Sequence, residues 1–191
     1  MNKRAIDTLS SDLIAARDHF ARITAGLAGV QLLGPKLAIV NPPLWEIGHV
    51  GWFQEHWCLR WRDDKGLAPS ILPNADALYN SSTVAHDTRW DLPLPSLAAT
   101  RSYLSAVLEK TLDRLAREPE NESLAYFVRL ATLHEDMHAE ALHYTHQTLG
   151  YAEPEIGVRA LFKSGSDPDL EFAGGSFRLG AERGEERFIF D

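Results

Sequence analysis

The 191-residue sequence has only one cysteine, Cys58, and no excess of basic residues. A single thiol excludes an internal disulfide and fits a reducing compartment. The net charge of −8 argues against nucleic acid or an anionic membrane as a partner, because both require a basic patch. Long apolar runs are also missing, and the first twenty residues include three aspartates. We therefore expect neither a signal peptide nor a membrane span, and predict a cytoplasmic protein.

Residues 122–149 contain neither proline nor glycine, which predicts one long helix that ends at Gly150. Apolar residues recur three and four apart along it, and His134 and His138 fall in register with them. Two imidazoles one turn apart on this core-facing side can chelate one metal ion at about 2.0–2.1 Å each. A packed core histidine is the alternative for each, but two at this spacing favour a metal site.

Three more helices are predicted upstream, over residues 4–29, 41–63 and 97–117, the second capped by Asn41 and the third by Ser96. Together with the long helix they predict an all-α fold. Its expected architecture is an antiparallel four-helix bundle with a long connection between helices two and three. Bundle cores are places where side chains of facing helices build metal sites.

The second predicted helix supplies a third candidate ligand, His49. Gly48 and Gly51 flank it and thin the helix there, so that another helix or a substrate can come close. His56 lies two turns farther on, roughly 10 Å away, so it cannot bind the same ion. We interpret His56 as a packed or surface histidine, and predict that His49 joins the two histidines of the long helix around one ion.

The remaining segments are the connection 64–96 and the stretch after Gly150. The connection mixes aromatic, hydroxyl and cationic groups, and its Arg89 is available for a substrate carboxylate, with a solvated loop as the alternative. After Gly150, glycines and prolines interspersed with phenylalanines predict short strands and turns. We expect a metal-binding domain at 1–150. At 151–191 we expect a linker and an irregular or β tail too short to bury its own core.

Two motifs and the tail carry a family resemblance. Residues 41–53 read NPPLWEIGHVGWF, and His134-x-x-x-His138-x-Glu140 follows. Both resemble the DinB-like N-terminal domain of the ergothioneine-type sulfoxide synthases, including selenoneine synthase-like members. Residues 172–191 look like the start of the formylglycine-generating-enzyme-like second domain of those enzymes, truncated at residue 191.

This resemblance implies a non-haem Fe(II), with Zn or Ni as alternatives, held by His49, His134 and His138. It implies an oxidoreductase that uses O2 to join a thiol or a selenium donor to the imidazole of a histidine betaine. The family's catalytic tyrosine belongs to the second domain, so no catalytic residue is expected within 1–191, and this stretch alone is expected to be inactive. A homodimer is compatible with this resemblance.

Two details of the long helix bear on that resemblance. Glu140 is interpreted as a hydrogen-bond acceptor behind the ligands or between helices, with a plain solvated glutamate as the alternative. The synthases commonly carry glutamines between the two ligand histidines, whereas this sequence has Asp136 and Met137. The substrate can therefore differ from theirs.

Two other functional readings are compatible with the histidine motif. His134-Glu135-x-x-His138 fits the zincin pattern, with Glu135 as general base. The third histidine of the longer metzincin form would fall at Tyr144, and a zincin needs a strand beside its helix, whereas the upstream sequence is helical. The stronger alternative is a free-standing DinB-like domain, either a metal-dependent thiol transferase or a metal-binding module. Fe(II) with O2 consumption favours the synthase, and Zn(II) without O2 uptake favours the alternatives.

Overall fold

The structure is a computed structural model that describes residues 3–62, 66–156, 169–180 and 188–190. Most of the first two ranges is helical, and the predicted all-α class is confirmed. Within the described ranges, the only strand-like pairing is one isolated bridge between Trp61 and Leu67. The α-helices are α1 (Lys3–Thr24), α2 (Pro43–Glu55), α3 (Ala75–Tyr79), α4 (Leu97–Arg117) and α5 (Glu122–Leu149).

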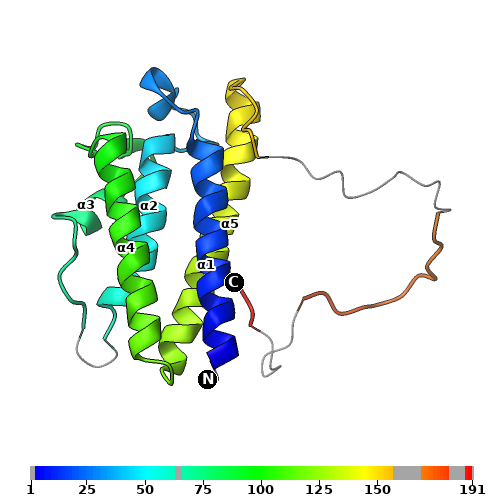
Figure 1. The fold of residues 1–191 in the computed structure, drawn as a ribbon. Helices are drawn as coiled ribbons and strands as arrows, with labels where there is room; N and C mark the ends of the chain where they lie inside the picture. The colour runs from blue at the N-terminus through cyan, green and yellow to red at the C-terminus, as the bar shows by residue number, and fades with distance from the viewer. Residues whose placement is uncertain (1–2, 63–65, 157–168, 181–187, 191) are drawn as a thin grey trace. The chain divides into compact units, whose positions relative to one another are not determined.

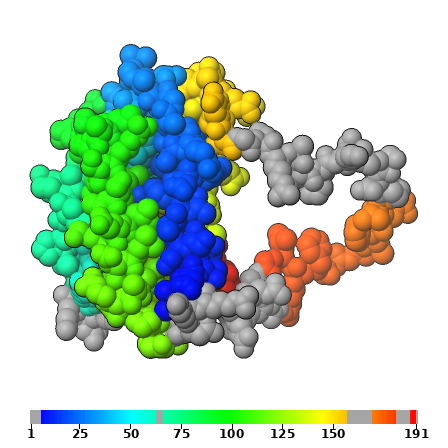
Figure 2. Space-filling view, viewed as in Figure 1, coloured from blue at the N-terminus to red at the C-terminus, as the bar shows by residue number. Residues whose placement is uncertain are grey.

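The four longer helices lie side by side (Figure 1). Helix α1 packs along α5, while α2 packs against both α4 and α5. On the face seen in Figure 2, the side chains of α1 (blue) and α4 (green) meet along the helices and close the interior from that side.

The ends of α4 and α5 follow directly from the sequence. The Ser96 hydroxyl accepts a hydrogen bond from the Ala99 amide at 3.2 Å, and the Asn121 side chain accepts one from the Leu124 amide at 2.9 Å. Each of these bonds satisfies an amide that has no partner within its own helix. Gly150 ends α5 in the left-handed conformation, with φ of 65°. The predicted bounds of these two helices are confirmed.

Helices α1 and α2 end earlier than predicted. Helix α1 stops at Thr24 rather than near residue 29, and its last turn is followed by two glycines, which are poor helix formers. The α-helical part of the second segment ends at Glu55, and the chain continues as a π-helical turn, η2 (His56–Arg60). Asn41 was predicted to cap α2, but the cap position is taken by Pro42. The Asn41 amide instead donates to the Glu46 carboxylate at 2.9 Å.

The connection between α2 and α4 is more ordered than its sequence indicates, because it contains α3 and a 3-10 turn, η4 (His86–Thr88). Arg60 of η2 forms two hydrogen bonds of 2.7 Å with the Asp76 carboxylate of α3. Asp76 also accepts a hydrogen bond from the Trp52 indole at 2.7 Å. These contacts fix α3 against the end of α2.

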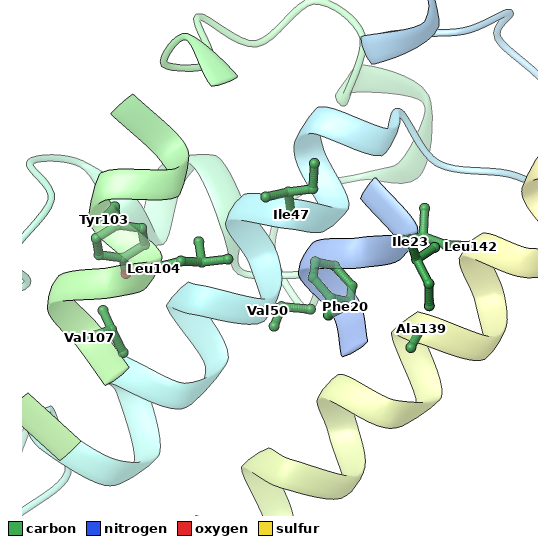
Figure 3. Packing of buried hydrophobic residues seen from close by; sticks show 9 residues of the cluster. All are labelled: Phe20, Ile23, Ile47, Val50, Tyr103, Leu104, Val107, Ala139 and Leu142. Atoms are coloured by element: carbon green, nitrogen blue, oxygen red, sulfur yellow. The ribbon is translucent and has the colours of Figure 1, made fainter. Parts of the chain in front are cut away.

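Apolar side chains from all four long helices form the largest buried cluster (Figure 3). Val107 and Leu142 are completely buried in it, and Phe20 is 1% exposed. Burying a side chain of this kind stabilises the fold by about 1.5–3 kcal/mol. The cluster comprises Phe20, Ile23, Ile47, Val50, Tyr103, Leu104, Val107, Ala139 and Leu142.

The chain divides into two compact units, Met1–Ile156 and Gly157–Asp191. In the second unit, the described ranges 169–180 and 188–190 contain no helix or strand. The remainder of the predicted irregular or β tail, over 157–168, 181–187 and 191, lies outside the described residues. Among the residues that the structure describes, no helix has the length and apolar character needed to cross a membrane.

Candidate metal centre

The structure brings together the three histidines that the sequence predicts as ligands. His49 of α2 lies opposite His134 and His138 of α5, with ring centroids 5.1 Å and 5.0 Å away. The rings of His134 and His138 are 4.6 Å apart, as expected for side chains one helical turn apart. All three residues are buried, between 3% and 8% exposed. Metal binding by this cluster stays a prediction, and its geometry can be compared with that of known metal sites.

The nitrogen atoms are close enough for a single ion. One ring nitrogen from each histidine lies within 4.8 Å of the other two. Some point therefore lies within about 2.8 Å of all three atoms, and metal–imidazole bonds are about 2.0–2.1 Å long. A shift of less than about 1 Å per ring therefore brings all three nitrogens to bonding distance.

The orientation of His49 is fixed by its neighbours. Its Nδ1–H donates to the Tyr79 carbonyl of α3 at 2.8 Å, which leaves the Nε2 lone pair available. Trp45 stacks on the same ring, with centroids 4.8 Å apart and planes 9° apart. Gly48 explains the close approach of α3, because a Cβ at this position would overlap the Tyr79 ring.

Burial keeps the imidazoles of His49 and His134 neutral, which is the form that binds metals. Burial, followed by the nearby His138, lowers the pKa of His49 to about 3. Burial, followed by His138 and His49, likewise lowers the pKa of His134 to about 2. The Phe53 ring stacks on His134 at 3.7 Å with planes 8° apart, and so shields it from water.

Several polar atoms around the cluster are buried without a hydrogen-bond partner among the described residues. They include Nδ1 of His134, Nδ1 of His138 and one carboxylate oxygen of Glu46. Buried polar groups are normally paired, and three together are unusual in a packed core. A cation bound by the other nitrogen of each ring would leave each Nδ1 as an N–H donor and would balance the charge of the nearby carboxylate, so these residues fit a metal ion.

Arg89 lies on the same side of α2 as the cluster. Its guanidinium sits 3.9 Å over the Trp45 ring, whose plane stacks on His49. It donates to the Asn41 side chain at 2.6 Å and to the Val84 carbonyl at 3.3 Å. Its Nε atom is buried and has no partner among the described residues. The predicted role in substrate binding stays a prediction.

The other singled-out residues lie elsewhere. Glu140 is exposed on α5, and the carboxylate beside the cluster is instead that of Glu46, 3.6 Å from His138 Nδ1. His56 belongs to η2 and is not a member of the converging group. Cys58 is completely buried, as predicted, and burial raises the pKa of its thiol.

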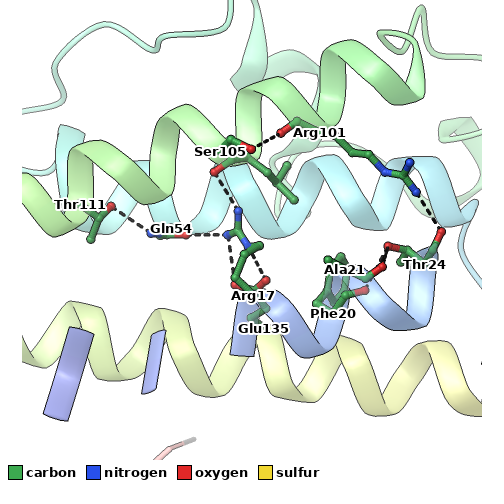
Figure 4. A network of polar contacts seen from close by, with 10 residues as sticks. Arg17, Phe20, Ala21, Thr24, Gln54, Arg101, Ser105, Thr111 and Glu135 are labelled. Carbon is green, nitrogen blue, oxygen red and sulfur yellow. Dashed lines mark hydrogen bonds and ion pairs between the residues drawn. The ribbon is translucent and has the colours of Figure 1, made fainter. Parts of the chain in front are cut away.

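The zincin reading is wrong, because Glu135 is not available as a general base. Its carboxylate is 1% exposed and forms an ion pair with Arg17 of α1, with Nε–Oε1 and Nη2–Oε2 distances of 2.5 Å and 3.1 Å (Figure 4). One residue after His134, it points to a different side of α5. No strand lies beside α5 among the described residues of this unit.

Sequence reasoning missed Glu46, Phe53 and Tyr79. Glu46 could have been found, since it precedes His49 by three residues and so lies on a neighbouring position of the same helix face. Phe53 follows His49 by four residues and is subject to the same rule. Tyr79 acts through its backbone carbonyl from a separate short helix, and no side-chain pattern indicates such a contact.

A helical fold with three buried, convergent histidines is typical of helical domains that can hold a metal ion between facing helices. Residues 12–142 match the model of the DinB superfamily. The chain belongs to the DinB superfamily.

The chain is also similar to three proteins named hercynine oxygenase. It is 30% identical to the one from Mycolicibacterium smegmatis over 139 residues, which is 72% of this chain and 32% of that protein. Identity is 34% over 105 residues for Mycobacterium tuberculosis (54% and 24%) and 30% over 135 residues for Mycolicibacterium thermoresistibile (70% and 29%). The matches thus cover about a third or less of each relative's length.

Proposed function

We propose that this chain supplies the metal-binding domain, an antiparallel four-helix bundle, of a non-haem Fe(II) enzyme. The enzyme would use O2 to join a thiol or selenium donor to the imidazole of hercynine, the betaine of histidine, and would release a sulfoxide or selenoxide. The observation that supports this most is the convergence of His49, His134 and His138 in a DinB domain. The similarity to hercynine oxygenases supports the substrate.

The chemistry of the donor set suits this reaction. Three neutral imidazoles leave a bound ion with its full 2+ charge and with open positions for an anionic sulfur donor and O2. The protein's own contribution is to fix the rings and exclude water. Tyr79 holds His49 through its carbonyl, and Phe53 covers His134.

Arg89 is proposed to bind a substrate carboxylate. Its guanidinium is held in place by Asn41 and lies against Trp45, next to His49. Arginine presents its N–H groups in a planar fork that matches a carboxylate. Each of its two Nη atoms carries two N–H bonds and forms one hydrogen bond here, so each keeps an N–H for such a ligand.

A zinc-dependent thiol transferase is the second candidate. Zn(II) also accepts three histidines and keeps an open fourth position in catalytic sites. The superfamily model matches residues 12–142, which all lie within the first unit. This match favours a domain that works without a second one, as the transferase would.

The experiment that separates the two functions measures metal preference and O2 uptake. The full-length enzyme proposed to contain this chain is freed of metal, loaded anaerobically with Fe(II) or Zn(II), and then mixed with hercynine and cysteine in air-saturated buffer. The proposed function predicts O2 uptake with Fe(II) that requires hercynine, and the new carbon–sulfur product by mass spectrometry. Retention of Zn(II) in preference to Fe(II), with no O2 uptake, would overturn it in favour of the transferase.

A further inference from the structure

Glu46 is a buried carboxylate next to a candidate metal ligand. It lies on α2, one turn before His49, and is 3% exposed. Its Oε1 accepts a hydrogen bond from the Asn41 side-chain amide at 2.9 Å and lies 3.6 Å from His138 Nδ1. Its Oε2 has no partner among the described residues.

An arrangement of this kind is unfavourable for a purely structural glutamate. A buried carboxylate normally requires a cation and several hydrogen bonds, because removing its charge from water costs several kcal/mol. The adjacent Nδ1 of His138 is also buried and unpartnered. The 3.6 Å gap exceeds an N–H···O hydrogen bond by about half an ångström, so a small rotation of either side chain closes it.

We propose that Glu46 is a positioning residue for His138. When a metal ion binds Nε2 of His138, the ring's Nδ1–H donates to the Glu46 carboxylate, which fixes the tautomer and the orientation of the ring. This proposal rests on the proposed metal-binding function. Carboxylates and carbonyls that accept from a ligating histidine in this way also raise its basicity.

The same arrangement already exists on the other helix of the site. His49 donates its Nδ1–H to the Tyr79 carbonyl and leaves Nε2 toward the cluster. With Glu46 bound to His138, one ligand from each helix would have a fixed Nδ1–H. Glu46 is not itself a member of the converging ligand group, which comprises the three histidines. Its role is therefore to orient a ligand and not to bind the ion.

Asn41 fixes the Glu46 carboxylate. The Asn41 carbonyl oxygen accepts from Arg89 Nη1 at 2.6 Å, so its amide nitrogen is directed to Glu46. A flipped amide would place two oxygens against each other and leave Arg89 without this acceptor. A continuous series of polar contacts thus connects Arg89 to His138 through Asn41 and Glu46.

The test is a titration of the metal-free chain with Co(II), followed by visible absorption. Glu46→Gln keeps the shape of the side chain but removes its charge, and should weaken Co(II) binding by about 10–100-fold. The absorption of the bound Co(II) should also change, because the His138 ring is no longer fixed. The metal-free Glu46→Gln variant should be at least as stable to urea as the wild type, since its buried charge is gone.

Glu55→Gln is the matched control. Glu55 lies on the same helix and is also buried, but its partners are Ser70, Ile71 and Tyr103. This variant should bind Co(II) as the wild type does, even if its folding is weakened. Asn41→Ala provides a second variant that leaves Glu46 in place without its fixed partner, and it should also weaken Co(II) binding.

Three outcomes are decisive. Weaker binding and an altered spectrum in Glu46→Gln, with unchanged binding in Glu55→Gln, support the proposal. Equal Co(II) affinity and an identical spectrum in Glu46→Gln and the wild type overturn it. A wild type that binds no Co(II) overturns the proposed function, and this result is distinct from failure of the Glu46 role alone.

Discussion

Replacing Arg17 with methionine should destabilise the fold more than any surface change, because Arg17 is the only cation paired with the buried Glu135 in the described polar network (Figure 4). Arg17 is 7% exposed and Glu135 is 1% exposed. The same guanidinium donates to the Gln54 side chain at 2.7 Å and to the Leu104 carbonyl at 2.8 Å. One side chain therefore joins α1 to α2, α4 and α5.

The magnitude follows from the charge that would be left behind. Removing one partner of a buried ion pair typically costs about 3–5 kcal/mol, mostly because the other charge stays buried and unpaired. Methionine retains much of the apolar stem, so the loss of packing adds little. The free energy of unfolding of a domain is about 5–15 kcal/mol in total, so the expected loss is a large fraction of it.

Urea unfolding of the metal-free chain at 25 °C, followed by circular dichroism, measures this loss. Arg101→Met is the matched control, since Arg101 is exposed and donates one hydrogen bond, to the Thr24 carbonyl at 3.1 Å. It should cost less than about 1 kcal/mol. The double variant with Arg17→Met and Glu135→Leu should recover most of the loss, because no unpaired charge remains.

The loss should also depend on pH. Burial raises the pKa of Glu135 above its ordinary value of 4.5, and Arg17 opposes that shift. In Arg17→Met the arginine charge no longer opposes the effect of burial, so the pKa of Glu135 is higher in the folded state than in the unfolded state. The variant's free energy of unfolding should therefore fall as pH rises through the folded-state pKa of Glu135. A loss below about 1 kcal/mol for Arg17→Met at pH 8, or no recovery in the double variant, would refute this reasoning.

Three further predictions concern single residues. Gly48→Ala should lower the free energy of unfolding by about 1–3 kcal/mol in urea, because its methyl group would overlap the Tyr79 ring, and should weaken metal binding by disturbing the contact of Tyr79 with His49. Gly150→Ala should cost about 1–2 kcal/mol in the same assay, because a side chain is strained at the φ of 65° of Gly150. The space around Gly150 is open, so no clash adds to this cost. Cys58 should react with a thiol reagent only at the rate of unfolding, and rapid labelling of the native chain would contradict its burial.

The features of α5 that sequence alone predicts are local ones. A single helical segment fixes the spacing of His134 and His138, and the glycine at 150 fixes its C-terminal end. Burial of both histidines agrees with the apolar periodicity.

The features that sequence did not predict depend on contacts between distant segments. Whether Glu46 or Glu140 lies beside the histidines depends on how α2 is rotated against α5, and helical spacing within either segment does not determine that. The Tyr79 carbonyl reaches His49 only because α3 folds back over α2. Likewise, the zincin pattern does not reveal that Arg17, far upstream, pairs with Glu135.

The central claim is that His49, His134 and His138 bind one metal ion together. Equilibrium dialysis against Fe(II) under anaerobic conditions, with metal analysis of the protein, measures the ion bound per chain for the wild type and for single alanine variants. Each of the three variants should lose most of its metal affinity while circular dichroism shows the helices intact. His56→Ala and His143→Ala change histidines outside the converging group, so both should bind as the wild type does. Loss of binding in His56→Ala with full binding in His49→Ala would contradict the claim.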